Sequence, residues 1–129
     1  MWQVASEKLN PEVQTLVGHE GRVWAIAFHP NGQILASCSE DYTIRLWDVA
    51  TGNWLCVWQA HDRWLRSVAF SPDGQLLASS CDNTIKLWDV KTQECLQTLR
   101  GHRQTVTAIA FSPNGQQLAS SSFDRTVKL

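Results

Sequence analysis

Short apolar runs separated by turn residues follow one another along the whole chain. In the stretch 72–89, Asp73-Gly74 and Asp82-Asn83 are turn signals. Residues 76–79 form a short apolar run between these turns, and residues 84–88 alternate between polar and apolar side chains. This pattern predicts a β-hairpin that ends in Trp-Asp. Because no segment has the period of an amphipathic helix, the pattern predicts an all-β chain.

The same hairpin occurs at two further places in the chain. It is found upstream at residues 30–48 and downstream at residues 113–129, where it stops one residue short of its Trp. Histidines at positions 19, 61 and 102 give repeat periods of 42 and 41 residues. A fixed period of roughly 40–45 residues with four strands per copy is typical of a propeller blade.

The repeats divide residues 1–129 into one domain with four antiparallel strands per full unit. The units cover residues 18–58, 60–99 and 101–129, and an additional outer strand is predicted at 12–17. Residues 23–28 are apolar on both sides, which predicts burial of this strand on both faces. The remaining predicted strands are 34–38, 43–47, 54–58, 65–70, 75–79, 84–88, 94–99, 106–111, 117–120 and 126–129.

Charge and composition narrow the class of function. The net charge of −1 gives no bulk attraction to nucleic acid or to an anionic membrane. No apolar run approaches the ~20 residues that span a bilayer, and the first residues lack the basic and apolar regions of a signal peptide. We therefore expect a cytoplasmic protein with neither nucleic acid nor membrane as its partner.

The four cysteines, at positions 38, 56, 81 and 95, show no metal-binding or disulfide pattern. They include no C-x-x-C pair and no His at ligand spacing. We expect reduced, partly buried thiols rather than disulfides or a metal site.

The repeated motif resembles the WD40 repeat. The carrying residues are G-H-x3-V-x2-I-A-F-x-P-N/D-G-x2-L-A-S followed by D-x-T-I-K/R-L-W-D, and they cover essentially the whole chain three times. The resemblance implies a β-propeller, in which blades of four antiparallel strands stand radially around a channel. It also implies a scaffold for protein–protein interaction with no chemistry and no cofactor of its own.

One His, Ser, Asp and Trp recur at matching positions of the repeats. In the WD40 family such residues form a buried chain of hydrogen bonds, which fixes one geometry when every member has a partner. The third copy lacks its Trp, and Trp2 could supply it. The set is His19, Ser37, Asp41 and Trp47, then His61, Ser79, Asp82 and Trp88, then His102, Ser120 and Asp124.

A catalytic triad is the alternative interpretation of Ser, His and Asp. The triplicate occurrence and the lack of a G-x-S-x-G elbow favour the structural interpretation over a hydrolase. A metal site built from the three repeated histidines is equally disfavoured, because adjacent blades hold them apart. His29 occupies a position where the other copies have Ser, and we expect it to be a surface substitution.

The resemblance also implies a protein-binding face at the narrow end of the ring. The aligned positions lie at the start of the innermost strand and just before the hairpin Asp. Trp and Arg among them are typical of binding hot spots, although the tryptophans could instead pack against neighbouring blades. These positions are Arg22, Trp24, Glu40, Trp64, Arg66, Cys81, Thr105, Thr107 and Phe123.

Three blades are too few to close a ring, since propellers have four to eight. Without Met1, the termini joined end to end read V-K-L-W-Q-V, which matches the interior of a repeat. We expect two chains to join head to tail into a six-bladed homodimer, each strand 12–17 completing the last blade of its partner. Three chains forming a larger ring are a variant of this arrangement. A fragment of a longer WD40 protein, or an architectural module without a binding activity of its own, is the alternative.

Overall fold

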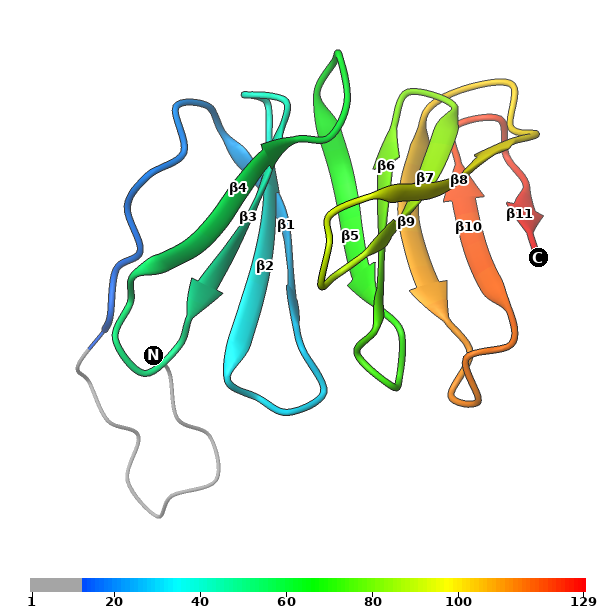
Figure 1. Cartoon of the computed structure of the whole chain (residues 1–129). Coiled ribbons are helices and arrows are strands. Elements are labelled where there is room, and N and C mark those ends of the chain that lie inside the picture. The colour runs from blue at the N-terminus through cyan, green and yellow to red at the C-terminus, as the bar shows by residue number, and fades with distance from the viewer. Residues whose placement is uncertain (1–12) are drawn as a thin grey trace.

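The computed structural model describes residues 13–129, which form three antiparallel β-sheets (Figure 1). Within this range, no helix is long and apolar enough to cross a membrane. The strands are β1 Val23–Phe28, β2 Ile34–Ser39, β3 Thr43–Asp48, β4 Trp54–Gln59, β5 Leu65–Phe70, β6 Leu76–Cys81, β7 Thr84–Asp89, β8 Cys95–Arg100, β9 Val106–Phe111, β10 Leu118–Ser122 and β11 Val127–Lys128.

Each sheet is a meander in which consecutive strands pair. The strand orders are β1-β2-β3-β4 in blade 1, β5-β6-β7-β8 in blade 2 and β9-β10-β11 in blade 3. The predicted all-β fold and the four-stranded repeat are confirmed. Most predicted strand boundaries lie within one or two residues of the observed ones, because Gly-containing and Asp-containing turns mark the ends of the strands.

The turns between the first two strands of each blade depend on glycine. Gly32, Gly74 and Gly115 have φ values of 72°, 74° and 72°. A residue with a β-carbon is strained at such positive φ values, whereas glycine adopts them at little cost. The Asn-Gly and Asp-Gly signals in the sequence therefore correspond to real turns.

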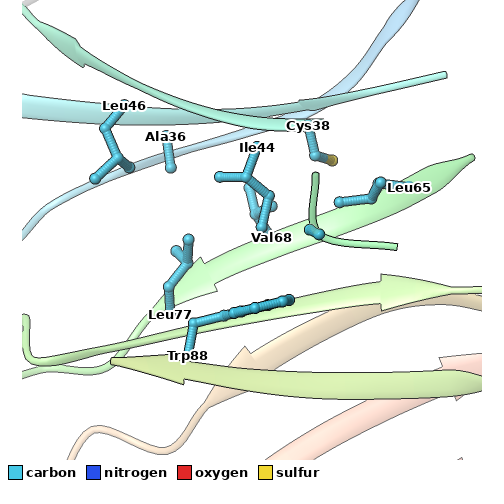
Figure 2. Close-up of a cluster of buried hydrophobic side chains, with 9 residues drawn as sticks. Ala36, Cys38, Ile44, Leu46, Leu65, Val68, Leu77 and Trp88 are labelled. Carbon is cyan, nitrogen blue, oxygen red and sulfur yellow. The ribbon is translucent and has the colours of Figure 1, made fainter. Parts of the chain in front are cut away.

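The three sheets stand side by side as blades, with β1 against β5 and β5 against β9 (Figure 1). Apolar side chains from neighbouring blades fill the space between them. Figure 2 shows Ile44 and Leu46 of blade 1 pointing toward Val68 and Leu77 of blade 2. A second cluster joins blades 2 and 3 through residues such as Ile85 and Ile109.

The prediction that β1 is buried on both faces is wrong. Its Ala25 and Ala27 pack against the cluster shared with blade 2. On the opposite face, Ile26 is 62% exposed and Phe28 is 53% exposed. No blade within residues 13–129 covers this face, and the apolar run itself carries no information about which neighbour is present.

The outer strand predicted at 12–17 is also not observed. Residues 13–17 form no strand, and residue 12 lies outside the described residues. The segment is held instead by the side chain of Gln14, whose amide nitrogen donates to the Val49 carbonyl at 3.1 Å and whose oxygen accepts from Gly52 N at 2.9 Å. These contacts anchor the segment to the β3–β4 turn without forming a ladder.

Candidate protein-interaction site

In blade 1 the repeated polar residues form a continuous chain of hydrogen bonds. The Trp47 indole N–H donates to Ser37 Oγ at 2.8 Å, and Ser37 Oγ lies 2.6 Å from His19 Nε2. The second ring nitrogen of His19 lies 2.8 Å from Asp41 Oδ2. Because the carboxylate can only accept, His19 Nδ1 carries the proton, and the Ser37 hydroxyl donates to Nε2. The chain ties β3 and β2 to the loop that precedes β1.

Blade 3 repeats this geometry without a tryptophan. His102 Nε2 lies 2.7 Å from Ser120 Oγ, and His102 Nδ1 lies 2.9 Å from Asp124 Oδ2. Trp2, which we expected to complete this chain, lies outside the described residues. In both blades the same carboxylate oxygen also accepts from a backbone N–H, at 3.0 Å from Glu20 N and from Arg103 N.

Blade 2 departs from the pattern, and the expected role of Asp82 is not observed. The Trp88 indole donates to Ser79 Oγ at 2.9 Å, and Ser79 Oγ lies 2.8 Å from His61 Nε2. Asp82, however, makes no hydrogen bond with His61 and pairs with Arg63 at 3.4 Å. The turn has one residue fewer than in blade 1, and Asp82 itself adopts a φ of 49° within it. The carboxylate is thereby withdrawn from the histidine.

The ionisation of these groups follows from their surroundings. Burial alone would raise the pKa of Asp41, but hydrogen bonds from Thr43, His19 and two backbone N–H groups outweigh it and lower the pKa to about 2. Bonds from Thr126, opposed by desolvation, keep the pKa of Asp124 well below its usual range. For His61, burial followed by the nearby Lys86 charge lowers the pKa to about 4.

Among the positions predicted for the protein-binding face, one arginine contacts aromatic side chains of both neighbouring blades. Arg66 of β5 lies with its Cζ 4.7 Å from the centroid of the Trp24 ring and 6.0 Å from that of Phe123. The Trp24 indole also donates to Glu40 Oε1 at 3.1 Å, and Arg22 lies 4.0 Å from the same oxygen. A guanidinium between aromatic rings is a favourable cation–π arrangement. Trp24 remains 42% exposed and Phe123 57% exposed, so this edge is open to a partner.

A shallow cavity of about 400 Å³ adjoins this cluster. Trp64, Arg66 and Thr105 line it, and Trp64 is 48% exposed. Trp24 thus packs against Arg66 of the neighbouring blade, as the alternative interpretation expects, and both tryptophans keep an exposed surface. Thr107 Oγ1 lies 3.0 Å from Ser121 Oγ, which ties β9 to β10.

Two residues differ from the sequence-based expectations, Cys81 on the predicted binding face and His29 beside its turn. Cys81 is only 3% exposed and lies at the end of β6, where it is paired with Leu65 and Thr84, so it is not part of the exposed edge around Trp24 and Phe123. His29 is not simply a surface substitution. Its Nε2 donates to the Gly74 carbonyl at 3.1 Å, and its ring packs edge-on against Phe70, so it joins blade 1 to blade 2.

Three residues that line the cavity beside Trp64 were not among the predicted face positions. Tyr42, Asp62 and Arg63 line it beside the expected positions. Tyr42 carries a φ of 73° in its hairpin turn, and the other two residues belong to the loop before β5. They vary between the repeats, so the repeat alignment gave no signal for them.

The cysteines are free, and the described residues hold no metal-binding cluster. All four thiols are unpaired; Cys38 and Cys81 are buried, whereas Cys95 is exposed. Burial raises the pKa of Cys38 to about 12 and that of Cys81 to about 11, which keeps both protonated. Within residues 13–129, no group of three or more His, Cys, Asp or Glu side chains is placed to bind a metal ion.

Comparison with known proteins identifies the class. The family model "WD domain, G-beta repeat" matches residues 10–48, 52–89 and 93–129. A crystal structure of RRP9 WD40 repeats superposes with a TM-score of 0.84 at 31% identity, covering 88% of this chain and 36% of that one. The chain therefore belongs to the WD40 family of β-propeller proteins, which serve as scaffolds for protein–protein interaction.

Curated relatives are similar over part of their length. The probable cytosolic iron-sulfur protein assembly protein Ciao1 of Culex quinquefasciatus is 47% identical over 72 residues, which are 53% of this chain and 21% of that protein. The nuclear distribution protein PAC1 of Arthroderma benhamiae is 38% identical over 91 residues, or 64% of this chain and 19% of the relative. The chain thus spans about a fifth of these relatives.

Proposed function

We propose that this chain is a non-enzymatic interaction scaffold whose open blade faces are covered by a second copy of itself. The main support is that apolar side chains at the ends of the blade row are exposed. Side chains at the equivalent positions are buried where a neighbouring blade is present. Ile26 is 62% exposed, whereas the equivalent Val68 and Ile109 are 5% and 8% exposed. Burying one such side chain is worth about 1.5–3 kcal/mol, which favours a partner on this face.

The opposite end of the blade row shows the complementary feature. Val127 of β11 is 72% exposed, whereas the equivalent Ile44 and Ile85 are 0% and 5% exposed. Within residues 13–129, no blade packs against the outer face of β1, and no blade packs against the outer face of blade 3. Each of these two faces could therefore serve as the missing neighbour of the other. A head-to-tail arrangement of two copies satisfies both faces and closes a ring of six blades. Residues 12–17 of each copy would then add a strand beside β11 of the other.

Co-purification of two differently tagged copies tests this proposal. Tagged and untagged wild-type chains should purify together, and Ile26→Asp should abolish this by placing a charge in the contact. Leu96→Asp is the matched control, because Leu96 is 54% exposed on β8, the outer strand of blade 2, which already has a neighbour on each side. Equal co-purification of both variants would overturn the proposal.

A second candidate is a segment of a longer propeller. The chain spans about a fifth of its curated relatives, and further blades of one polypeptide would cover the same faces. In that case the isolated chain would not form a defined dimer. The solution mass of the wild-type chain separates the two candidates.

The edge around Trp24, Arg66 and Phe123 would bind a protein or peptide partner. Its aromatic and arginine side chains are of the types that dominate binding hot spots. The near-neutral net charge offers no footprint for nucleic acid or membrane, and we place the protein in the cytoplasm, in keeping with the name of its cytosolic Culex relative. Arg66→Ala should remove captured partners from a cell extract, whereas Arg103→Ala should retain them.

The Ser, His and Asp residues would not act in hydrolysis. Ser37, Ser79 and Ser120 are each less than a tenth exposed, and each hydroxyl is committed to a histidine. A nucleophile needs access to its substrate, so these positions suit strand anchoring better.

A further inference from the structure

The position that a carboxylate occupies in blades 1 and 3 is not filled by a carboxylate in blade 2. In the other two blades, one Asp oxygen accepts from a histidine Nδ1 and from the backbone N–H of the residue that follows the histidine. The equivalent donors in blade 2 are His61 Nδ1 and Asp62 N. Among residues 13–129, neither has a hydrogen-bond acceptor, because the shorter turn carries Asp82 away to Arg63.

The histidine of blade 2 is nevertheless held in the same orientation as its counterparts. His61 is 5% exposed, and its Nε2 lies 2.8 Å from Ser79 Oγ. Ser79 Oγ already accepts from the Trp88 indole, so its own proton goes to His61 Nε2. In the neutral ring Nδ1 therefore carries the other proton and remains a donor. His61 lines a cavity, so a ligand in that cavity could accept the proton of Nδ1 and complete the hydrogen bond that the Asp completes in the other blades.

A cavity of about 680 Å³ lies at this position. His61 lines it together with Asp62, Asp82, Thr84, Lys86 and Arg100. Asp82 is paired with Arg63, and the remaining charged groups of the lining are Lys86 and Arg100, which are positive, and Asp62, which is negative. Lys86 Nζ donates to the Ala60 carbonyl at 3.4 Å and lies 5.8 Å from the centroid of the Trp88 ring, and its ammonium group retains donors for a ligand.

We infer that this cavity is a binding site for a single carboxylate group, which takes the place that Asp41 and Asp124 occupy in the other blades. The carboxylate would accept from His61 Nδ1 and Asp62 N and would be attracted by Lys86 and Arg100. It could come from a small free acid or from an acidic side chain of a bound polypeptide. Both sources present the same chemistry to the site.

Titration with acetate, followed by NMR of the histidine ring C–H signals, tests the inference. Acetate should shift the His61 signals saturably, with a dissociation constant on the order of millimolar. His19 and His102 serve as internal controls, because each already holds a carboxylate and should not respond. A second titration uses the acetylated and amidated peptide Ser-Glu-Asp-Tyr, with Ser-Gln-Asn-Tyr as its uncharged control.

Two variants make the outcome specific. Replacing residues 82–83 with Glu-Asp-Tyr restores the turn length of blade 1 and should abolish the response, because the new carboxylate fills the site. Lys86→Ala should weaken acetate binding about fivefold, whereas Lys128→Ala, at the equivalent position of blade 3, should leave it unchanged. This second pair keeps the test valid if the longer turn prevents folding.

The results assign the source or reject the site. A saturable response to acetate identifies a free acid as sufficient, and a response to the acidic peptide alone identifies an acidic side chain. If neither probe shifts the His61 signals, or if Lys86→Ala and Lys128→Ala bind alike, the inference is overturned.

Discussion

At the scale of single residues, the three repeats form a natural mutational series. Blade 1 has the complete Trp, Ser, His and Asp chain, and blade 2 has the same chain without its carboxylate. The donors and acceptors that remain have nearly the same distances in both blades. The histidine and serine therefore hold their positions without the Asp, and the carboxylate contributes energy more than geometry.

The cost of losing the carboxylate should differ sharply between blades. Asp41→Ala leaves His19 Nδ1 and Glu20 N without an acceptor and should lower the free energy of unfolding by about 1–3 kcal/mol. Asp82→Ala removes only an exposed ion pair with Arg63 and should cost at most about 1 kcal/mol. Urea denaturation of the two variants at one protein concentration measures this difference. Equal losses would contradict the assigned roles.

Acid should destabilise the protein through His61. Its folded-state pKa of about 4 lies below the ordinary histidine value of 6.5, so the unfolded chain binds the proton more tightly. The stability that His61 contributes is present above about pH 6.5 and is lost as the pH falls toward about 4. Asp41 adds a separate loss below about pH 4, because its folded-state pKa is about 2.

Denaturation at a series of pH values checks this dependence. The free energy of unfolding should decline between about pH 6.5 and 4, and His61→Gln should flatten that part of the profile. An unchanged slope in the variant would show that another group carries the proton linkage.

At the scale of strands and turns, the repeat pattern was sufficient to predict most of the fold. Gly32 and Gly74 mark turns because their positive φ requires glycine, and the strands between turns alternate in register with the core. The same alignment failed for Cys81 and Asp82. The sequence shows that the β6–β7 turn is one residue shorter than its counterpart in blade 1. It does not show where the side chains of the shorter turn point, because that depends on the backbone geometry of the turn.

The burial of a strand face could not be read from its own sequence. Ile26 and Val68 occupy equivalent positions in similar apolar runs, yet only Val68 has a blade beside it. The cation–π contacts of Arg66 with Trp24 and Phe123 were likewise not predictable, because they depend on how three blades are placed side by side. The sequence predicted the candidate residues, and the packing of the blades determined their contacts.

Two glycine substitutions should separate backbone strain from inter-blade packing. Gly32→Ala introduces strain at a φ of 72° with open space around the new methyl group, and should cost about 1 kcal/mol. Gly74→Ala has the same strain, but its methyl group would meet the His29 ring and displace this contact between blades. It should therefore cost more. Adding His29→Ala should make Gly74→Ala less costly, which thermal or urea unfolding of the double variant would measure.

At the scale of the whole molecule, the blade row ends in two different sheet faces, and both expose apolar side chains. One end presents Ile26 and Phe28 of β1, and the other presents Val127 of β11, all more than half exposed. Figure 1 shows β1 and β11 in the first and last sheets of the row. In the other blades, the equivalent faces are covered by a neighbouring blade. A second copy could cover the two end faces through the same kind of blade-to-blade contact.

The solution mass of the wild-type chain, measured by light scattering after size exclusion over a range of concentrations, tests this account most directly. Closure by a second copy predicts a single species at twice the mass of the chain. A well-folded monomer, or a broad distribution that changes with concentration, would contradict closure and favour a segment that needs further blades of a longer protein.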